Sequence, residues 1–227
     1  MSNKPTIIKL PIQSFCFGVR NAIKKTNNVL SNVATSKPLS MLGEVVHNKY
    51  VSEYFENQGV TVYKEGTRLE MLDNIKDGTV IITAHGVIDQ VKYKINSLGL
   101  SIVDTTCPFV SNSIKLIKKY LNLDYTIIYI GSKNHPESET AVSFGEKVIL
   151  ISSIDEAKNL NIDTDKLIVT NQTTMSMYDI QDIIDCLKTK YPHLEAMEKV
   201  CSALLKDKKW LWKRLNNIKI ILQQPLS

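Results

Sequence analysis

Three cysteines recur along this chain at nearly equal spacing, and each is followed at once by a segment with helical character. Cys16, Cys107 and Cys201 stand 91 and 94 residues apart in a chain of 227 residues. Self-similarity at a fixed period indicates a structural unit that is used more than once. A chain folded in this way can bring one thiolate from each copy to a common centre, and three thiolates around one point suggest a metal cluster.

The repeat extends beyond the cysteines. In both of the first two units a β-like run leads into the pattern Gly-x-x-x-His, which closes with His47 in the first unit and His135 in the second. Later in each unit a second apolar run precedes polar residues, His85 in the first and the segment 172–174 in the second. The third unit offers its cysteine, one helix-like stretch and one apolar run, so we interpret the chain as two repeats and a fraction.

Composition and charge narrow the class of protein. Hydrophobic residues make up 43% of the chain and charged residues 22%, as in soluble globular proteins. The sequence has no run of about 18 apolar residues and no apolar secretory core at its start, so we expect a cytoplasmic protein. Four cysteines without a close-spaced pair do not suggest a disulfide framework. The net charge of +5 is mild, and the sequence has no basic stripe interleaved with aromatic residues, so nucleic-acid binding is poorly supported. The lysines most simply form a solvated helix surface; the alternative is that they attract an acidic redox partner or a phosphorylated ligand.

Apolar runs alternate with amphipathic segments, which predicts α/β units built on parallel sheets. Strands are expected over 39–46, 60–64, 78–83, 101–104, 125–130, 147–151 and 166–170. Helices are expected over 17–31, 49–57, 88–97, 109–121, 154–160 and 177–190. We place domain one at 14–104, domain two at 105–198, and the stub of a third domain, with an aberrant sequence, at 199–227.

The chemistry-bearing residues fall at two kinds of position. Ligands of open parallel sheets bind beyond the carboxyl ends of the strands, and His47, His85 and His135 follow predicted strands directly, so we expect a shared anion site. The cysteines open helices, whose N-terminal N–H groups and dipole lower the pKa of a thiol and favour an anionic cluster. Pro108 after Cys107 suits the first position of a helix, and a Cys-Pro pair also occurs at iron–sulfur ligands.

Each of these residues also has an ordinary structural interpretation. A buried cysteine is more often a small core residue than a ligand, and Cys186 inside a predicted helix fits that interpretation, as His193 fits the surface. Structural zinc sites use four ligands with close-spaced pairs, so three separated thiolates suit a [4Fe–4S] cluster with one open iron better. Glu137 is either an acid catalyst beside His135 or a first-turn carboxylate favoured by the helix dipole, and the residues alone leave both open.

Six motifs in order, between about residue 7 and residue 203, carry a resemblance to a known family. They are FCFGV around Cys16, EVVHNKYV around His47, TAHGV around His85, DTTCPFV around Cys107, NHPESE around His135 and NQTTMS around Thr173. With these motifs the chain resembles the 4-hydroxy-3-methylbut-2-enyl diphosphate reductases, which end the methylerythritol phosphate pathway of isoprene biosynthesis. The resemblance implies a trefoil of three α/β domains around a central [4Fe–4S] cluster.

The resemblance further implies reductive removal of an allylic hydroxyl, with two electrons and two protons, to give isopentenyl and dimethylallyl diphosphate. Reduced ferredoxin or flavodoxin would supply the electrons. The implied cluster ligands are Cys16, Cys107 and Cys201. The implied substrate-binding residues are His47, His85, His135, Gln172, Thr173 and Thr174. The implied catalytic residues are Glu137, which delivers a proton, His135, which serves the proton path, and Thr173, which orients substrate and donor.

The segment after Cys201 departs from the family. There the family reads C-x-A-T-x-x-R-Q, whereas this chain reads CSALLKDK and continues with KKWLWKR. Restoring one adenine to a plausible coding sequence for 205–213 gives LKRQKVVME, which recovers Arg-Gln. We therefore hypothesise that residues from about Asp207 onward are out of frame, which resequencing of the gene would test.

With the third domain largely missing, we expect little or no reductase activity. Two alternatives remain: a catalytically inactive remnant that binds a phosphorylated ligand, and a structural zinc protein.

Overall fold

The chain folds into two parallel four-stranded sheets with the same topology. The computed structural model describes residues 15–46, 48–175 and 177–197. The first sheet has the strand order β2-β1-β3-β4 and the second β6-β5-β7-β8. The strands are β1 (Leu39–Leu42), β2 (Val60–Tyr63), β3 (Thr79–Ile82), β4 (Ser101–Asp104), β5 (Thr126–Ile130), β6 (Val148–Ile151), β7 (Leu167–Asn171) and β8 (Glu195–Ala196). The predicted α/β class with repeated parallel sheets is therefore confirmed.

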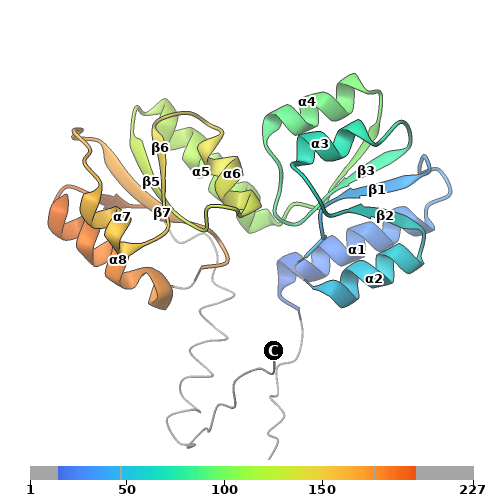
Figure 1. Cartoon of the computed structure of the whole chain (residues 1–227), viewed down its shortest axis with the longest axis horizontal. Coiled ribbons are helices and arrows are strands. Elements are labelled where there is room, and N and C mark those ends of the chain that lie inside the picture. The colour runs from blue at the N-terminus through green and yellow to red at the C-terminus, as the bar shows by residue number, and fades with distance from the viewer. Residues whose placement is uncertain (1–14, 47, 176, 198–227) are drawn as a thin grey trace, which may run out of the picture.

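Helices cover both faces of each sheet, and the two sheets lie side by side (Figure 1). We call residues 17–104 the first repeat and residues 108–196 the second. The helices of the first repeat are α1 (Phe17–Ser31), α2 (Lys49–Asn57), α3 (Arg68–Asp73) and α4 (Asp89–Ser97). Those of the second are α5 (Pro108–Asn122), α6 (Pro136–Val142), α7 (Ile154–Asn159) and α8 (Met177–Lys190). In the first repeat α1 and α2 pack on one face of the sheet and α3 and α4 on the other; in the second, α7 and α8 oppose α5 and α6.

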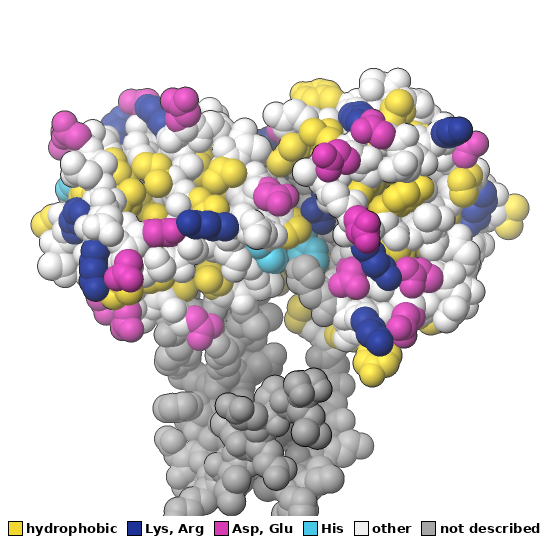
Figure 2. All heavy atoms as spheres, viewed as in Figure 1, with side chains coloured by type: hydrophobic (Ala, Val, Ile, Leu, Met, Phe, Trp, Pro, Cys, Tyr) yellow, Lys and Arg dark blue, Asp and Glu magenta, His cyan; other side chains and the backbone are white. Residues whose placement is uncertain are grey.

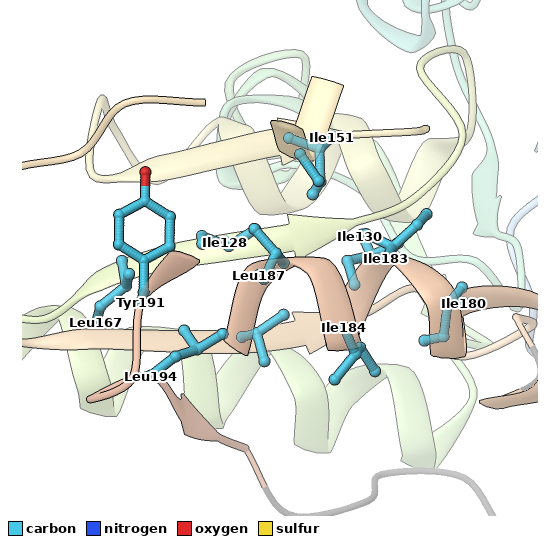
Figure 3. Packing of buried hydrophobic residues seen from close by; sticks show 12 residues of the cluster. Ile128, Ile130, Ile151, Leu167, Ile180, Ile183, Ile184, Leu187, Tyr191 and Leu194 are labelled. Atoms are coloured by element: carbon cyan, nitrogen blue, oxygen red, sulfur yellow. The ribbon is translucent and has the colours of Figure 1, made fainter. Parts of the chain in front are cut away.

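Burial on both faces explains the apolar character of the strands. All four residues of β1 and of β3 are buried, as expected for parallel strands covered on both sides. Helix α8 meets its sheet through Ile180, Ile183, Ile184 and Leu187, which recur at helical spacing and point toward Ile128 and Ile130 of β5 (Figure 3). The two sheets are thus held rigidly, and their strand ends are fixed points on which a site can be built.

The predicted elements match the structure except at a few places with identifiable causes. The predicted strand over 39–46 is wrong at its end, because β1 stops at Leu42 and Gly43 adopts a φ of 86°, which leaves the strand conformation. Sequence periodicity does not predict the short helices α3 and α6, of six and seven residues, or the two-residue strand β8, because such short elements show too few repeats of their pattern. The domain boundary that we propose near residue 104 falls between β4 and α5, and the segment 199–227 lies outside the described residues.

Across the residues that the structure describes, no helix combines the length and the apolar character needed to cross a membrane.

Candidate active site

The loops that follow β3 and β5, a central strand of each sheet, meet at the boundary between the repeats. In a sheet of order 2-1-3-4 the connections leave β1 and β3 in opposite directions, and ligands bind at such a switch point. His85 follows β3, and His135 follows β5 of the other sheet. Their rings meet edge to face with centres 5.3 Å apart, and Figure 2 shows histidine side chains at the surface between the two repeats. The predicted grouping of these two histidines is therefore present in the fold.

Backbone hydrogen bonds tie the His85 loop to the start of α5. The amide of Ala84 donates to the carbonyl of Val45 at 3.2 Å, and the amide of Cys107 donates to the carbonyl of Ala84 at 2.9 Å. Gly86 follows with a φ of 76°, a left-handed conformation that favours glycine, which lets the chain turn directly after the imidazole. One loop thus fixes His85 and Cys107 relative to each other.

Cys16 and Cys107 occupy equivalent positions in the two repeats, each as the residue before the first turn of a helix. Gly18 lies between the two sulfurs: a Cβ built there would stand 2.4 Å from the Sγ of Cys107 and 4.0 Å from that of Cys16. The two sulfurs can be no farther apart than the sum of these distances. Helix N-termini with unpaired N–H groups favour thiolates and anionic clusters, so the pair and its glycine cradle fit a metal–sulfur group held between the repeats.

Two of the predicted site residues, His47 and Cys201, lie outside the described residues. Within the described ranges, no group of three metal-ligating side chains converges on one point. A set of three thiolates therefore stays a prediction.

His135 caps the first turn of α6. Its Nδ1 accepts a hydrogen bond from the backbone amide of Glu137 at 3.1 Å. When the imidazole is neutral, this acceptor role leaves the proton on Nε2, the nitrogen that points away from the cap. The close approach of α6 to the preceding loop requires Gly131, because a Cβ there would stand 2.5 Å from the hydroxyl of Ser138.

Glu137 and Thr173 form the best-defined polar contact of the site. The backbone amide of Thr173 donates to Oε2 of Glu137 at 2.8 Å, and its hydroxyl donates to Oε1 at 2.9 Å. Glu137 is only 5% exposed. Burial raises the pKa of this carboxyl above its ordinary value, and the two bonds from Thr173 oppose that rise without cancelling it. A buried carboxyl with a raised pKa is a candidate proton donor.

Gln172 and Thr174 connect the end of β7 to the end of β5. The side-chain oxygen of Gln172 accepts from the backbone amide of Ser132 at 3.0 Å, while its nitrogen donates to the hydroxyl of Thr174 at 2.6 Å. These bonds hold Thr173 between them in front of Glu137. A direct role of Gln172 and Thr174 in substrate binding remains a prediction.

Sequence reasoning missed Arg68, the first residue of α3. Its guanidinium lines a cavity of about 570 Å³ between the repeats, which His85, Asn134 and Glu139 also line. Its Nη2 donates to the hydroxyl of Thr83 at 3.3 Å, and its buried Nε has no hydrogen-bond partner in the described part of the chain. The Thr-x-x-Glu capping box at the start of α3 could have indicated this helix from the sequence. It does not indicate where the arginine side chain lies.

Comparison with known proteins identifies the family. The family model described as LytB protein matches residues 7–220 of this chain. The chain belongs to the LytB family. Curated LytB relatives named 4-hydroxy-3-methylbut-2-enyl diphosphate reductase include one from Bacillus cytotoxicus, 41% identical over 198 residues, and one from Bacillus subtilis, 40% identical over 198 residues. Each alignment covers 87% of this chain and 63% of the relative, so the chain spans less than two thirds of the length of these relatives.

Solved structures agree with the LytB assignment. The E-1-hydroxy-2-methyl-but-2-enyl-4-diphosphate reductase from Plasmodium falciparum superposes with a TM-score of 0.81 at 27% identity, over 91% of this chain and 64% of that one. A second solved structure, of (E)-4-hydroxy-3-methyl-but-2-enyl diphosphate reductase, gives a TM-score of 0.71 at 23% identity, which supports the fold alone.

Proposed function

We propose that this LytB protein takes part in the reductive removal of the hydroxyl group of 4-hydroxy-3-methylbut-2-enyl diphosphate, which yields isopentenyl and dimethylallyl diphosphate. The observation that carries the proposal is the buried Glu137–Thr173 pair, set beside the His85–His135 pair at the ends of two sheets. An acid held with a raised pKa next to two imidazoles is a suitable arrangement for protonating a leaving hydroxyl on an anionic substrate.

The histidines bind the diphosphate in this proposal. The Nε2–H of a neutral His135 is directed away from its helix cap, and His85 faces it across the boundary between the repeats. Diphosphate oxygens accept hydrogen bonds from imidazole N–H groups, and a protonated ring adds charge attraction. His47, which follows the same pattern in the sequence, is assigned to the same group by analogy.

Glu137 delivers the proton. Its raised pKa makes the protonated form easier to reach than in an ordinary glutamate, and Thr173 fixes the plane of the carboxyl through both of its oxygens. The hydroxyl of Thr173 accepts a hydrogen bond as well as donating one, so it can orient the substrate hydroxyl toward the acid.

Cys16, Cys107 and Cys201 hold a [4Fe–4S] cluster in this proposal. When bound, such a cluster would supply electrons one at a time and polarise the substrate hydroxyl. The fit rests on the two sulfurs that flank Gly18 at paired helix starts. A small acidic redox protein, such as reduced ferredoxin or flavodoxin, is the proposed electron donor, and the net charge of +5 favours its approach.

The test is binding of the allylic diphosphate to the anaerobically cluster-loaded chain, measured by titration calorimetry, followed by single-turnover product analysis with a chemical reductant. His135→Asn keeps a helix-capping side chain but removes the imidazole, and should weaken binding about tenfold or more, as one charge-assisted hydrogen bond is lost. His193→Ala, on an exposed turn, is the matched control.

Glu137→Gln should retain binding within a few-fold and lower even the low product formation expected of this chain by about a hundredfold, with Glu146→Gln on the surface as its control. Affinity no better than for inorganic diphosphate would contradict the proposal. If the unaltered chain binds the substrate tightly but forms no product, the inactive remnant is favoured. If the purified protein is colourless and contains zinc, the structural zinc protein is favoured.

A further inference from the structure

A small cavity lies next to Glu137, between α5, β5 and α6. Its volume of about 10 Å³ is the size at which a single water molecule begins to fit. Four polar residues line it: Ser113, Tyr129, Glu137 and Thr140. The rest of its wall is apolar and comes from α5 and α6. Thr173 is not part of this wall, so the cavity touches Glu137 independently of the Thr173 contact.

Ser113 presents an unpaired hydroxyl. The residue is 4% exposed, and its Oγ has no hydrogen-bond partner in the described part of the chain. A buried hydroxyl without a partner costs about 1–3 kcal/mol, and buried polar side chains are nearly always bonded to protein or to ordered water. Since Ser113 lines the cavity, the cavity is where its partner can be.

Glu137 has capacity for a further hydrogen-bond partner in either protonation state. Each carboxyl oxygen accepts one hydrogen bond from Thr173, which leaves one lone pair on each when the group is ionised. When the group is protonated on Oε2, its O–H requires an acceptor that the Thr173 amide, a donor only, does not provide. The hydroxyl of Thr140 is already committed as a donor to the carbonyl of Pro136 at 2.8 Å and keeps only acceptor capacity.

We propose that this cavity holds one ordered water molecule, which accepts a hydrogen bond from the Ser113 hydroxyl and bonds to the Glu137 carboxyl. The water donates to the ionised carboxylate and accepts from the protonated acid. Ser113 is thereby a positioning residue, since it acts on Glu137 through the water. The water site stands on geometry alone, whereas its part in setting the protonation of the acid for catalysis rests on the proposed function.

The groups around Glu137 define what else can influence its protonation. Tyr129 of β5 faces it, and burial, followed by the charge of Glu137, raises the pKa of that phenol well above its ordinary value. His135 lies at the start of the same helix, with His85 beyond it. Thr173 is not titratable, and α5 contributes no titratable side chain to the cavity wall. A change at Ser113 therefore alters hydrogen bonding to Glu137 without altering a neighbouring charge.

The test combines a high-resolution crystal structure of the full chain with a ¹³C NMR titration of the Glu137 carboxyl, assigned by its loss in Glu137→Gln. Ser113→Val removes the hydroxyl and fills the space with methyl groups. We expect ordered water in the unaltered protein and none in Ser113→Val, whose Glu137 pKa rises by about half a unit to one unit because the carboxylate loses a donor. Ser138→Ala is the control, since its hydroxyl is also buried and unpaired in the described chain but does not line the cavity.

A dry cavity in the unaltered protein would overturn the proposal, as would an unchanged Glu137 pKa in a folded Ser113→Val. Should Ser113→Val not fold, Ser113→Ala removes the donor without added bulk and must raise the same pKa. If the cavity holds water but the protein does not bind the allylic diphosphate, the water site is supported and the proposed function is refuted. If the cavity is dry but the protein forms product, only the water site is refuted.

Discussion

Thr173 donates both its backbone amide and its hydroxyl to the carboxyl of Glu137, one to each oxygen, at 2.8 and 2.9 Å. The two residues are 36 positions apart, and they meet because β5 and β7 are neighbours in one parallel sheet. The loop after each strand therefore starts at the same sheet edge. This contact fixes the orientation of the carboxyl and opposes the effect of burial on its pKa.

Replacing Thr173 by valine should raise the pKa of Glu137 further, because the ionised carboxylate loses one of its two donors. The protein should lose about 1.5–3 kcal/mol of unfolding free energy where Glu137 is ionised, and less where it is protonated. Denaturant unfolding at a series of pH values measures both effects. Thr173→Ser keeps the hydroxyl and is the control; equal Glu137 pKa values in the two variants would refute the assigned hydrogen bond.

Burial of Glu137 should also leave a signature in the pH dependence of stability. The unfolded carboxyl releases its proton at about pH 4, whereas the folded one, with its raised pKa, holds it longer. Its contribution is thus fully present below the unfolded pKa and is lost as pH rises through the folded pKa, by about 1.4 kcal/mol for each unit of separation. Glu137→Gln lacks this loss.

The quantity to measure is the difference in unfolding free energy between the unaltered protein and Glu137→Gln. Other carboxyls act in the opposite direction, such as Glu156, whose pKa is lowered to about 2 by its bond from Lys133. They are common to both proteins and cancel in the difference. A difference that stays constant with pH would show that Glu137 titrates normally in the fold.

Gly18→Ala should retain the fold but load iron poorly. A Cβ at this position would stand 2.4 Å from the Sγ of Cys107, so that thiol must rotate away from its present position. Alanine otherwise favours a helix over glycine by about 1 kcal/mol, so thermal stability should not fall. Asn28→Ala, on an exposed turn of the same helix, is the control for helix propensity. If Gly18→Ala binds as much iron as the unaltered chain, Gly18 is not needed to hold the metal–sulfur group.

Arg68→Met tests whether the half-buried guanidinium stabilises the fold. Burial lowers the pKa of Arg68, opposed only by the charge of Glu139, and its Nε has no partner in the described chain. A charge buried with so little compensation is often replaced by an apolar side chain of similar length without loss. We expect the unfolding free energy to change by less than about 1 kcal/mol or to rise. A loss of about 3 kcal/mol or more would mean that the arginine is fully paired, and Arg68→Lys separates charge from hydrogen-bond geometry.

Much of this fold was predictable because its signals are periodic. The Cys16 and Cys107 helices, and strands β1 and β5 that follow them, repeat with nearly the same spacing, and a buried parallel sheet requires continuous apolar runs. The placement of histidines at strand ends then followed from a general rule of α/β sheets.

Other parts of the site could not be predicted from a single sequence. The hydrogen bonds from Thr173 to Glu137 depend on the register between β5 and β7, which sequence periodicity does not specify. The role of Gly18 depends on the approach of α1 to α5 from the other repeat. Arg68 resembles any exposed first-turn residue in the sequence, and only the packing of the two repeats partly covers it.

The central claim is that the cysteines which begin the repeated helices hold one iron–sulfur cluster. Its most direct test is the Mössbauer spectrum and iron content of the full chain after anaerobic reconstitution with iron and sulfide. We predict one [4Fe–4S] cluster in the unaltered protein and in Cys186→Ala, whose cysteine packs against the core of the second repeat, and its loss in Cys16→Ser and Cys107→Ser. A chain that binds no cluster, or cysteine variants that retain it in full, would contradict the account.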